Sequence, residues 1–284
     1  MAARRLERPP GTLPLYARAA AALVPGASRL PFVAGGGGDV PDTELELTTA
    51  VERERLAAYA RVCGFSLRDA LPPTYPHVLA FPLHMALMTD GGFPVAAVGL
   101  VHLANRITQH RPLSLGEELE LRVRATPLVP HPRGRTFSIV TEARVAGDAV
   151  WESESTMLRR GGGEGESGGK RSQRKPLPKA AEWRLPGDLG RRYAGVSGDR
   201  NPIHLSGPTA KLLGFPRAIA HGMWTKARCL AALETRLPDA FSVDVEFRRP
   251  ILLPGTVAFA CDDRLRFEVR DAREGTMHLE GFVS

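Results

Sequence analysis

An internal repeat constrains the fold of this chain more than any other feature of its sequence. Three segments of the first half each match a segment of the second half, in the same order and at a nearly constant offset. The matched pairs are "YARVCGF" (59–65) with "YAGVSGD" (193–199), "YPHVLAFPLHM" (75–85) with "FPRAIAHGM" (215–223), and "HRPLSLGEEL" (110–119) with "RRPILLPGTV" (248–257). Such agreement is hard to attribute to chance, so we predict two copies of one structural unit. A single copy leaves its helix and sheet edge poorly covered, and the two copies are therefore expected to pair.

A segment rich in Gly, Ser, Lys and Pro separates the two copies. Residues 159–183, "RRGGGEGESGGKRSQRKPLPKAAEW", lack apolar periodicity and have the composition of a flexible linker. We predict a first domain over 1–160, a linker over 161–183 and a second domain over 184–284. The chain of 284 residues is long enough to give each domain its own core.

Helical signals precede strand signals in both halves. Thr49 and Glu52 form a capping-box pattern for a helix over 51–63, and the second half repeats the order with helices expected over 189–198 and 221–236. Apolar and polar residues then alternate, which is the period of a half-buried strand. The alternating segments are 116–128, 136–145, 149–158, 242–249, 256–261, 264–269 and 276–283. We therefore predict an α+β fold of two repeats, each with a helix wrapped by a strongly curved antiparallel sheet.

The net charge of +7 and the isoelectric point of about 9.8 leave several partners open. Nucleic acid, an anionic membrane and an acidic or phosphorylated small partner are all compatible with this charge, as are solvated charges from an arginine-rich composition. The basic residues are neither concentrated on one periodic helix nor interleaved with aromatic residues, which argues against a nucleic-acid partner. No segment approaches the roughly 18 apolar residues of a membrane span.

Cysteine usage and the N-terminus bear on the compartment. Cys63, Cys229 and Cys261 are scattered outside any CxxC pattern, which argues against a disulfide framework and a zinc site and favours a reducing, cytoplasmic setting. Basic residues followed by an alanine-rich run near the N-terminus superficially resemble a signal peptide. Pro14 and Arg18 interrupt its apolar core, so we expect no export signal.

One motif concentrates groups able to move protons. "YAGVSGDRNPIHLS" (193–206) places Asp199, Asn201 and His204 within six positions. Each residue alone has an ordinary structural interpretation, since Asp is common in turns and caps and a lone His is commonly a surface or satisfied side chain. At the position of Asp199 the first copy carries Phe65.

The first copy has lost the polar residues at a second place as well. It carries Phe81 and Pro82 where the second copy has His221 and Gly222. A motif needed only for folding should be needed in both copies, so this asymmetry favours function in the second half.

Metal and nucleotide sites have little support in the sequence. Asp199, His204 and His221 are suitable ligand types, but they lack clustered ligand spacing, and we predict no metal. The glycine runs at 35–38 and 161–163 lack the strand-turn-helix context of a phosphate-binding or dinucleotide-binding loop. We therefore expect no cofactor.

The residues of the second half carry a resemblance to a known family. "YAGVSGDRNPIHLSGPTAKLLGFPRAIAHGM" (193–223) resembles the signature of the MaoC-like, or hydratase 2, family of (R)-specific enoyl-thioester hydratases and 3-hydroxyacyl-thioester dehydratases. The first half is similar, less clearly, to the degenerate domain of two-domain members, and the whole chain looks most like the actinobacterial ones. The resemblance implies a double hot dog fold with a non-catalytic first domain and a catalytic second domain.

The resemblance also implies a reaction and the residues that carry it. The reaction is the reversible hydration of trans-2-enoyl thioesters, or dehydration of (3R)-hydroxyacyl thioesters, in fatty-acid metabolism. Asp199 and His204 match the family's acid-base pair, and Asn201 has the amide needed to position the pair or the water. Gly222 opens a helix, so its N–H is free to donate to the thioester oxygen. His221 and Ser197 are candidate supporting residues.

Several alternatives remain open at this point. The second copy could be a non-catalytic acyl-thioester binding or scaffold subunit, or a hot dog thioesterase. The first copy could line an apolar cleft for a long acyl chain or be a packed core without ligand. The positive charge suits the phosphates of coenzyme A as well as an acidic acyl carrier protein. The chain could be a monomer of two fused repeats or a homodimer.

Overall fold

The computed structural model describes residues 2–22, 24, 26–27, 33–161 and 176–284. Contacts between Cα atoms divide the chain into two compact units. The first unit comprises Met1–Ala50, His77–Leu103 and Gly116–Lys170, and the second comprises Val51–Pro76, Ala104–Leu115 and Arg171–Ser284. The second unit thus includes two segments from the first half of the sequence, which a single cut at the linker does not anticipate.

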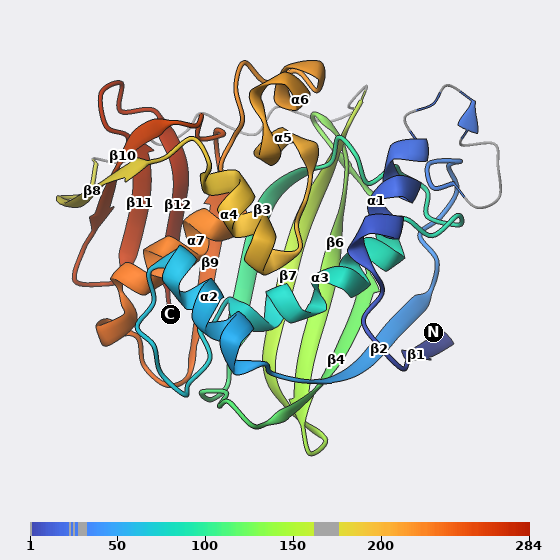
Figure 1. Cartoon of the computed structure of the whole chain (residues 1–284), viewed down its shortest axis with the longest axis horizontal. Helices are drawn as coiled ribbons and strands as arrows, with labels where there is room; N and C mark the ends of the chain where they lie inside the picture. The colour runs from blue at the N-terminus through green and yellow to red at the C-terminus, as the bar shows by residue number, and fades with distance from the viewer. Residues whose placement is uncertain (1, 23, 25, 28–32, 162–175) are drawn as a thin grey trace. The chain divides into compact units, whose positions relative to one another are not determined.

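The first unit is a sheet with a helix on one face. Its strands follow the order β1, β2, β4, β6, β7, and a further strand, β5, pairs with β6. Their bounds are β1 Ala2–Leu6, β2 Thr43–Ala50, β4 Glu118–Ala125, β5 Val129–His131, β6 Gly134–Val145 and β7 Asp148–Arg160. The helices are α1 (Thr12–Ala21) and α3 (Tyr75–Met88), and Figure 1 shows α3 across β4, β6 and β7. The pairing of β1 with β2 is parallel, whereas the other pairs of this sheet are antiparallel.

The second unit has an antiparallel sheet in the order β3, β9, β12, β11, β10, β8. The strands are β3 Val101–Gln109, β8 Lys179–Leu185, β9 Phe241–Phe247, β10 Gly255–Cys261, β11 Arg266–Asp271 and β12 Met277–Val283. The helices are α2 Arg53–Cys63, α4 Leu189–Ser197, α5 Pro202–Leu205, α6 Gly207–Leu212 and α7 Gly222–Ala232, followed by a 3₁₀ turn, η2, at Glu234–Arg236. Figure 1 shows α7 crossing the strands, as expected for a helix wrapped by a sheet.

The alternating segments of the sequence all form strands, and their apolar residues make the core. Along β9, Val243 and Val245 are buried, whereas Glu246, the next residue of the strand, is exposed. Leu121 and Val123 of β4 are buried in the same manner in the first unit. The period of two therefore identified the core face of each strand.

The capping-box prediction at Thr49 is wrong. Helix α2 begins at Arg53, and its N-cap, Glu52, makes no side-chain capping hydrogen bond. Thr49 instead lies in β2, where it pairs with Leu119 of β4. Because its backbone belongs to the sheet, its hydroxyl is not placed to cap the helix.

The predicted linker differs from the structure at its end. Residues 162–175 of the linker lie outside the described residues, but 179–183 form the first part of β8, which pairs with β10. Trp183 anchors this strand by stacking on Phe259, with ring centroids 4.9 Å apart. The burial of this tryptophan explains why pairing begins before the predicted boundary.

In the described part of the chain, no helix is long and apolar enough to cross a membrane.

Candidate active site

The end of α4 presents the acidic residue of the motif. The helix ends at Gly198, whose left-handed conformation (φ 77°, ψ −7°) suits glycine, and the N–H of Gly198 donates to Ala194 O. Ser197 Oγ donates to Tyr193 O at 2.9 Å and accepts the N–H of Asp199 at 3.2 Å. Ser197, a candidate supporting residue, thus fixes the backbone of Asp199 where the chain leaves the helix.

Asn201 begins the short helix that carries the histidine. Its N–H donates to Asp199 Oδ1 at 3.1 Å, and its side-chain Oδ1 accepts the N–H of Ile203 at 3.4 Å. Asn201 is therefore the N-cap of α5, and Pro202 occupies the first helical position that proline favours. The amide positions the backbone between Asp199 and His204.

His204 is a buried imidazole with a defined tautomer. The side chain is 8% exposed, and Nδ1 lies 2.8 Å from the carbonyl oxygen of Ile219. Because a carbonyl only accepts, Nδ1 carries the hydrogen and Nε2 of the neutral ring is free to accept a proton. Burial lowers the pKa of His204, against the opposing effect of Asp199, so the ring is neutral near pH 7.

His221 connects the acid to the histidine. It is 2% exposed, and its Nε2–H donates to the backbone oxygen of Asp199 at 3.0 Å. Its ring stacks on that of His204, with centroids 3.6 Å apart and 24° between the planes. Burial, and then the proximity of His204, lower the pKa of His221 to about 3. Because the pKa values of both histidines are lowered, both stacked rings are neutral near pH 7.

Gly222 begins α7 directly after His221. The N–H of a first helical residue has no acceptor within the helix, and the helix dipole makes this end positive. A Cβ atom at this position would lie 3.0 to 3.2 Å from three ring atoms of Phe247. Glycine therefore allows the close approach of the β9 ring and leaves the N–H uncovered by a side chain.

The corresponding positions of the first copy differ in structure as well as in residue type. Phe65, which replaces Asp199, is 6% exposed. Pro82, which replaces Gly222, lies inside α3 and not at a helix start. Proline has no N–H, and an interior helical position has no free donor, so the first copy lacks this donor for two reasons.

Asp199, His204 and His221 also form a group that could hold a metal, with ligand atoms within 4.8 Å of one another among the described residues. The stacked rings direct their nitrogen lone pairs along nearly parallel planes, whereas a shared ion needs converging lone pairs. Nδ1 of His204 and Nε2 of His221 are also engaged with backbone oxygens. The arrangement therefore suits proton transfer better than metal binding.

Sequence reasoning missed a buried lysine close to the site. Lys226 of α7 is 0% exposed, and its Nζ donates to Asn105 Oδ1 (2.6 Å), Asn105 O (3.0 Å) and Val243 O (3.2 Å). Burial lowers the pKa of Lys226 well below its usual range. Lys226 attaches α7 to β3 and β9. The sequence did contain a signal for its burial. Lys226 lies three residues after Met223 and four before Leu230, which places it on the apolar stripe of the helix.

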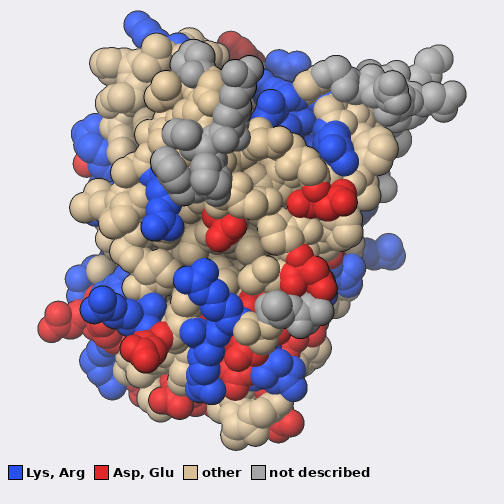
Figure 2. Space-filling model, turned by 90° about the vertical axis from the view of Figure 1, so that its right-hand side faces the viewer, with Lys and Arg blue, Asp and Glu red and all other residues tan. Residues whose placement is uncertain are grey.

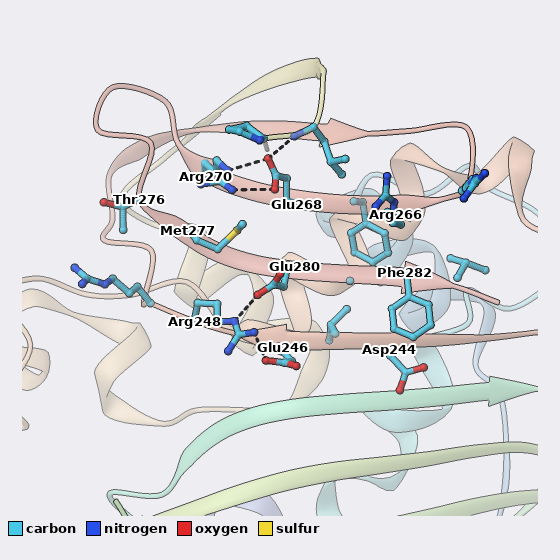
Figure 3. A pocket seen from close by; sticks show the side chains of 18 residues that line it. Asp244, Glu246, Arg248, Arg266, Glu268, Arg270, Thr276, Met277, Glu280 and Phe282 are labelled. Atoms are coloured by element: carbon cyan, nitrogen blue, oxygen red, sulfur yellow. Dashed lines mark hydrogen bonds and ion pairs between the residues drawn. The ribbon is translucent and has the colours of Figure 1, made fainter. Parts of the chain in front are cut away.

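A groove of about 1390 Å³ lies apart from this site, over β9, β12 and β11 (Figure 3). Its charges are largely paired within the groove, since Arg248 contacts Glu280 at 2.6 Å and Arg270 contacts Glu268 at 2.8 Å. None of the site residues named above lines the groove. The groove is therefore separate from the candidate site.

Surface charges are mixed rather than sorted. Figure 2 shows one face on which Lys and Arg side chains are interspersed with Asp and Glu. In the first unit, Arg122 of β4 hydrogen-bonds to Glu120 at 2.7 Å and lies 3.6 Å from Glu46. This pattern favours solvated, paired charges on this face over a nucleic-acid surface.

Comparison with known proteins agrees with the fold. Residues 166–277 match the protein-family model of the MaoC like domain. The 3-hydroxyacyl-thioester dehydratase X of Mycobacterium tuberculosis is 39% identical over 240 residues, which is 82% of this chain and 85% of the relative.

Solved structures give the same result. A crystal structure of HtdX of Mycobacterium tuberculosis matches with a TM-score of 0.74 and 38% identity, over 84% of this chain and 98% of that one. A MaoC-like dehydratase from Phytophthora capsici matches with a TM-score of 0.68 and 20% identity, over 86% and 95% of the two chains, which shows a shared fold. The predicted hot dog fold is thereby confirmed. Identity over most of both chains to the dehydratase from Mycobacterium tuberculosis shows that this chain belongs to the MaoC-like dehydratase family.

Proposed function

We propose that this chain catalyses the reversible hydration of trans-2-enoyl thioesters, which in the opposite direction is dehydration of (3R)-hydroxyacyl thioesters. The observation that carries the proposal is the cluster at the start of α7, where Asp199, His204 and His221 lie within 4.8 Å of one another and Gly222 follows in the chain. Proton acceptors and a free backbone donor thus occupy one site. The stereochemistry is taken from the family resemblance.

Acid-base chemistry is assigned to Asp199 and His204. In dehydration, one member of the pair removes the proton from C2 of the substrate, and the other donates a proton to the C3 hydroxyl, which leaves as water. The electrons of the C2–H bond become the new double bond as the C3–O bond breaks. The neutral His204, with Nε2 free, is in the correct form to accept a proton. Proton transfer of this kind contributes about 100- to 10,000-fold to a rate.

The developing negative charge is assigned to Gly222. Removal of the C2 proton places charge on the thioester oxygen, and the N–H at the positive end of α7 is the proposed donor to it. One such donor contributes about 3 kcal/mol to the barrier in other enzymes. His221 supports both functions, because it precedes Gly222 and contacts Asp199 and His204. Asn201 and Ser197 hold the backbone on either side of Asp199.

The test is a direct assay of the double bond. Loss of the ultraviolet absorbance of crotonyl-CoA and longer enoyl-CoA substrates is measured for the wild type, Asp199→Asn and His204→Asn. We expect each variant to lower the rate by about 100-fold or more. Asp188→Asn, the same substitution at an exposed residue before α4, serves as the matched control and should retain the wild-type rate.

The assay also separates the alternative functions. Equal rates in both site variants and the wild type would contradict the assigned roles. Release of free thiol without hydration indicates a thioesterase, and binding of enoyl thioesters without either reaction indicates a binding subunit. Both outcomes would overturn the proposal.

The carrier, the chain length and the location belong to the same proposal. The net charge of +7 supports a negatively charged carrier. Measuring the rate with the same acyl group on coenzyme A and on an acyl carrier protein distinguishes the two carriers.

We also propose that the first domain accommodates the acyl tail, which predicts faster turnover of longer chains. A preference for short chains contradicts this role. Cys63, Cys229 and Cys261 are free, which supports a reducing, cytoplasmic setting.

A further inference from the structure

A continuous series of buried aromatic rings leads to the proposed acid-base pair. His204 stacks on His221 at 3.6 Å between centroids, and His221 contacts Tyr193 of α4 at 4.8 Å. Tyr193 lies 6.1 Å from Tyr59, and Tyr59 lies 5.2 Å from Tyr75 at the start of α3. We call these five rings the ring series. All five lie within the second unit.

A hydrogen bond fixes Tyr59 within the ring series. Tyr59 is 0% exposed, and its hydroxyl donates to Thr74 Oγ1 at 2.7 Å. Thr74 is also 0% exposed, so water does not compete for this bond. Burial raises the pKa of both Tyr59 and Tyr193 well above the usual range, which keeps both hydroxyls protonated and able to donate. The position of the Tyr59 ring is therefore well determined.

The near end of the ring series determines how His204 is oriented. One edge of the His204 ring is held by Ile219 O, while one face is held by His221. The His221 ring is held in turn by the backbone oxygen of Asp199 and by Tyr193. A displaced Tyr193 would allow the histidine stack to tilt, and Nε2 of His204 would move from its reactive position.

Tyr59 itself comes from the first copy of the repeat. It occupies the position that matches Tyr193 in the second copy, and it belongs to α2, which packs with the second unit. Trp224 of α7 donates to Val62 O at 3.0 Å, which attaches α2 to the helix that begins at Gly222. Tyr59, which belongs to the copy without the acid-base motif, thus reaches the site through Tyr193, its counterpart in the second copy.

We propose that Tyr59 is a positioning residue for His204, acting through Tyr193 and His221. This inference rests on the proposed function for its kinetic consequences. It predicts that changes at Tyr59 lower kcat while leaving KM nearly unchanged, because the ring series orients a proton-transfer group and not the bound thioester. Small displacements of catalytic groups reduce rates strongly, since proton transfer needs a near-ideal geometry.

The experiment compares substitutions along the ring series. Tyr59→Leu removes the ring and is expected to lower kcat about 10-fold, with KM within about twofold. Tyr59→Phe keeps the ring but removes the hydroxyl, and Thr74→Val removes the same hydrogen bond from the other side. Each of these two is expected to lower kcat about threefold, and the agreement between them identifies the bond.

Phe267→Leu is the matched control for loss of a buried ring. Phe267 of β11 is 1% exposed and lies in the same unit, outside the ring series. We expect it to lower stability without changing kcat by more than about twofold. Equal kcat values in Tyr59→Leu and the wild type, or an equal fall of kcat in Phe267→Leu and Tyr59→Leu, would overturn the inference.

A spectroscopic measurement separates this inference from the proposed function. Imidazole ¹⁵N chemical shifts report the tautomer of His204, which in the wild type carries its hydrogen on Nδ1. Tyr59→Phe and Thr74→Val are expected to shift or broaden these signals even if Tyr59→Leu does not fold, and Phe267→Leu is not. Absence of hydration by the wild type rejects the proposed function, whereas unchanged ¹⁵N signals in both milder variants reject the role of Tyr59.

Discussion

The two copies of the repeat share a helix end but differ at the residue that follows it. Helix α2 ends at Gly64 (φ 83°) and α4 ends at Gly198 (φ 77°), and each glycine N–H donates to an alanine oxygen one turn earlier. Phe65 follows the first glycine and is buried, whereas Asp199 follows the second and contacts His221. The same backbone thus presents apolar bulk in one copy and an acid in the other.

The second difference lies where the central helix begins. Helix α7 begins at Gly222, while α3 begins at Tyr75 and contains Pro82 in its interior. Only α7 therefore offers an uncovered N–H beside the histidines. The comparison teaches that the chemistry depends on the beginning of one helix as much as on the acid and the base.

The largest expected effect comes from replacing Gly222 of α7 with proline, which is the residue at the matching position, Pro82, of α3. Gly222→Pro is compatible with a first helical position but removes the N–H. We expect kcat to fall about 100- to 1000-fold, as for loss of an oxyanion donor elsewhere. Gly222→Ala is the control, because it keeps the N–H while also crowding Phe247. An equal loss in the two variants would show that crowding, and not the donor, is responsible.

The next effect concerns the attachment of α7 to its sheet. The duplicate position of Lys226 in α3 is Ala86. Lys226→Ala removes the donor of the buried hydrogen bonds to Asn105 and Val243, so we expect the free energy of unfolding to fall by about 3 kcal/mol. Urea denaturation measures this change. Lys179→Ala, at an exposed lysine, should change it by less than about 1 kcal/mol, and equal effects would contradict the structural role of Lys226.

Both units bury a neutral histidine, and this predicts how stability depends on pH. Burial lowers the pKa of His84 in the first unit and of His221 in the second to about 3. An unfolded histidine has a pKa of about 6.5, so between these values the unfolded chain binds more protons and stability falls as the pH decreases. We expect a loss of about 2 kcal/mol per histidine between pH 7 and pH 5.

Urea midpoints at pH 7, 6 and 5 measure this dependence. His84→Leu should flatten it, because one of the buried histidines with a lowered pKa is removed. A wild-type slope in His84→Leu would mean that other groups cause the pH dependence.

The smallest expected effect separates the two helix ends. Gly198→Ala and Gly64→Ala each place a side chain on a left-handed residue, at a cost of about 1 kcal/mol. The new Cβ at residue 64 would also lie close to the Arg228 guanidinium, which lies over the Trp183 ring, so this variant should be the less stable one. Gly198→Ala should be the less active of the two variants, since Gly198 precedes Asp199. Thermal unfolding measures stability, and the hydration assay measures activity. If the same variant were lower in both measurements, the different roles of the two helix ends would be contradicted.

Much of the site and of the strand pattern could be predicted from local signals. Asp199, Asn201 and His204 lie within six residues, and the alternation of the strands depends on neighbours two positions apart. The capping prediction at Thr49 failed because the backbone of Thr49 pairs with a strand that is distant in sequence, β4. The parallel pairing of β1 with β2 gave no local signal of its direction.

The sequence by itself determined the repeat and the asymmetry between Phe65 and Asp199, because each depends only on residue type and near neighbours. Only the tertiary structure decided that α2 belongs with the second unit, that His221 stacks on His204 and that Lys226 reaches three oxygens. These contacts join residues distant in sequence, and their geometry follows from how the helices pack against the sheet.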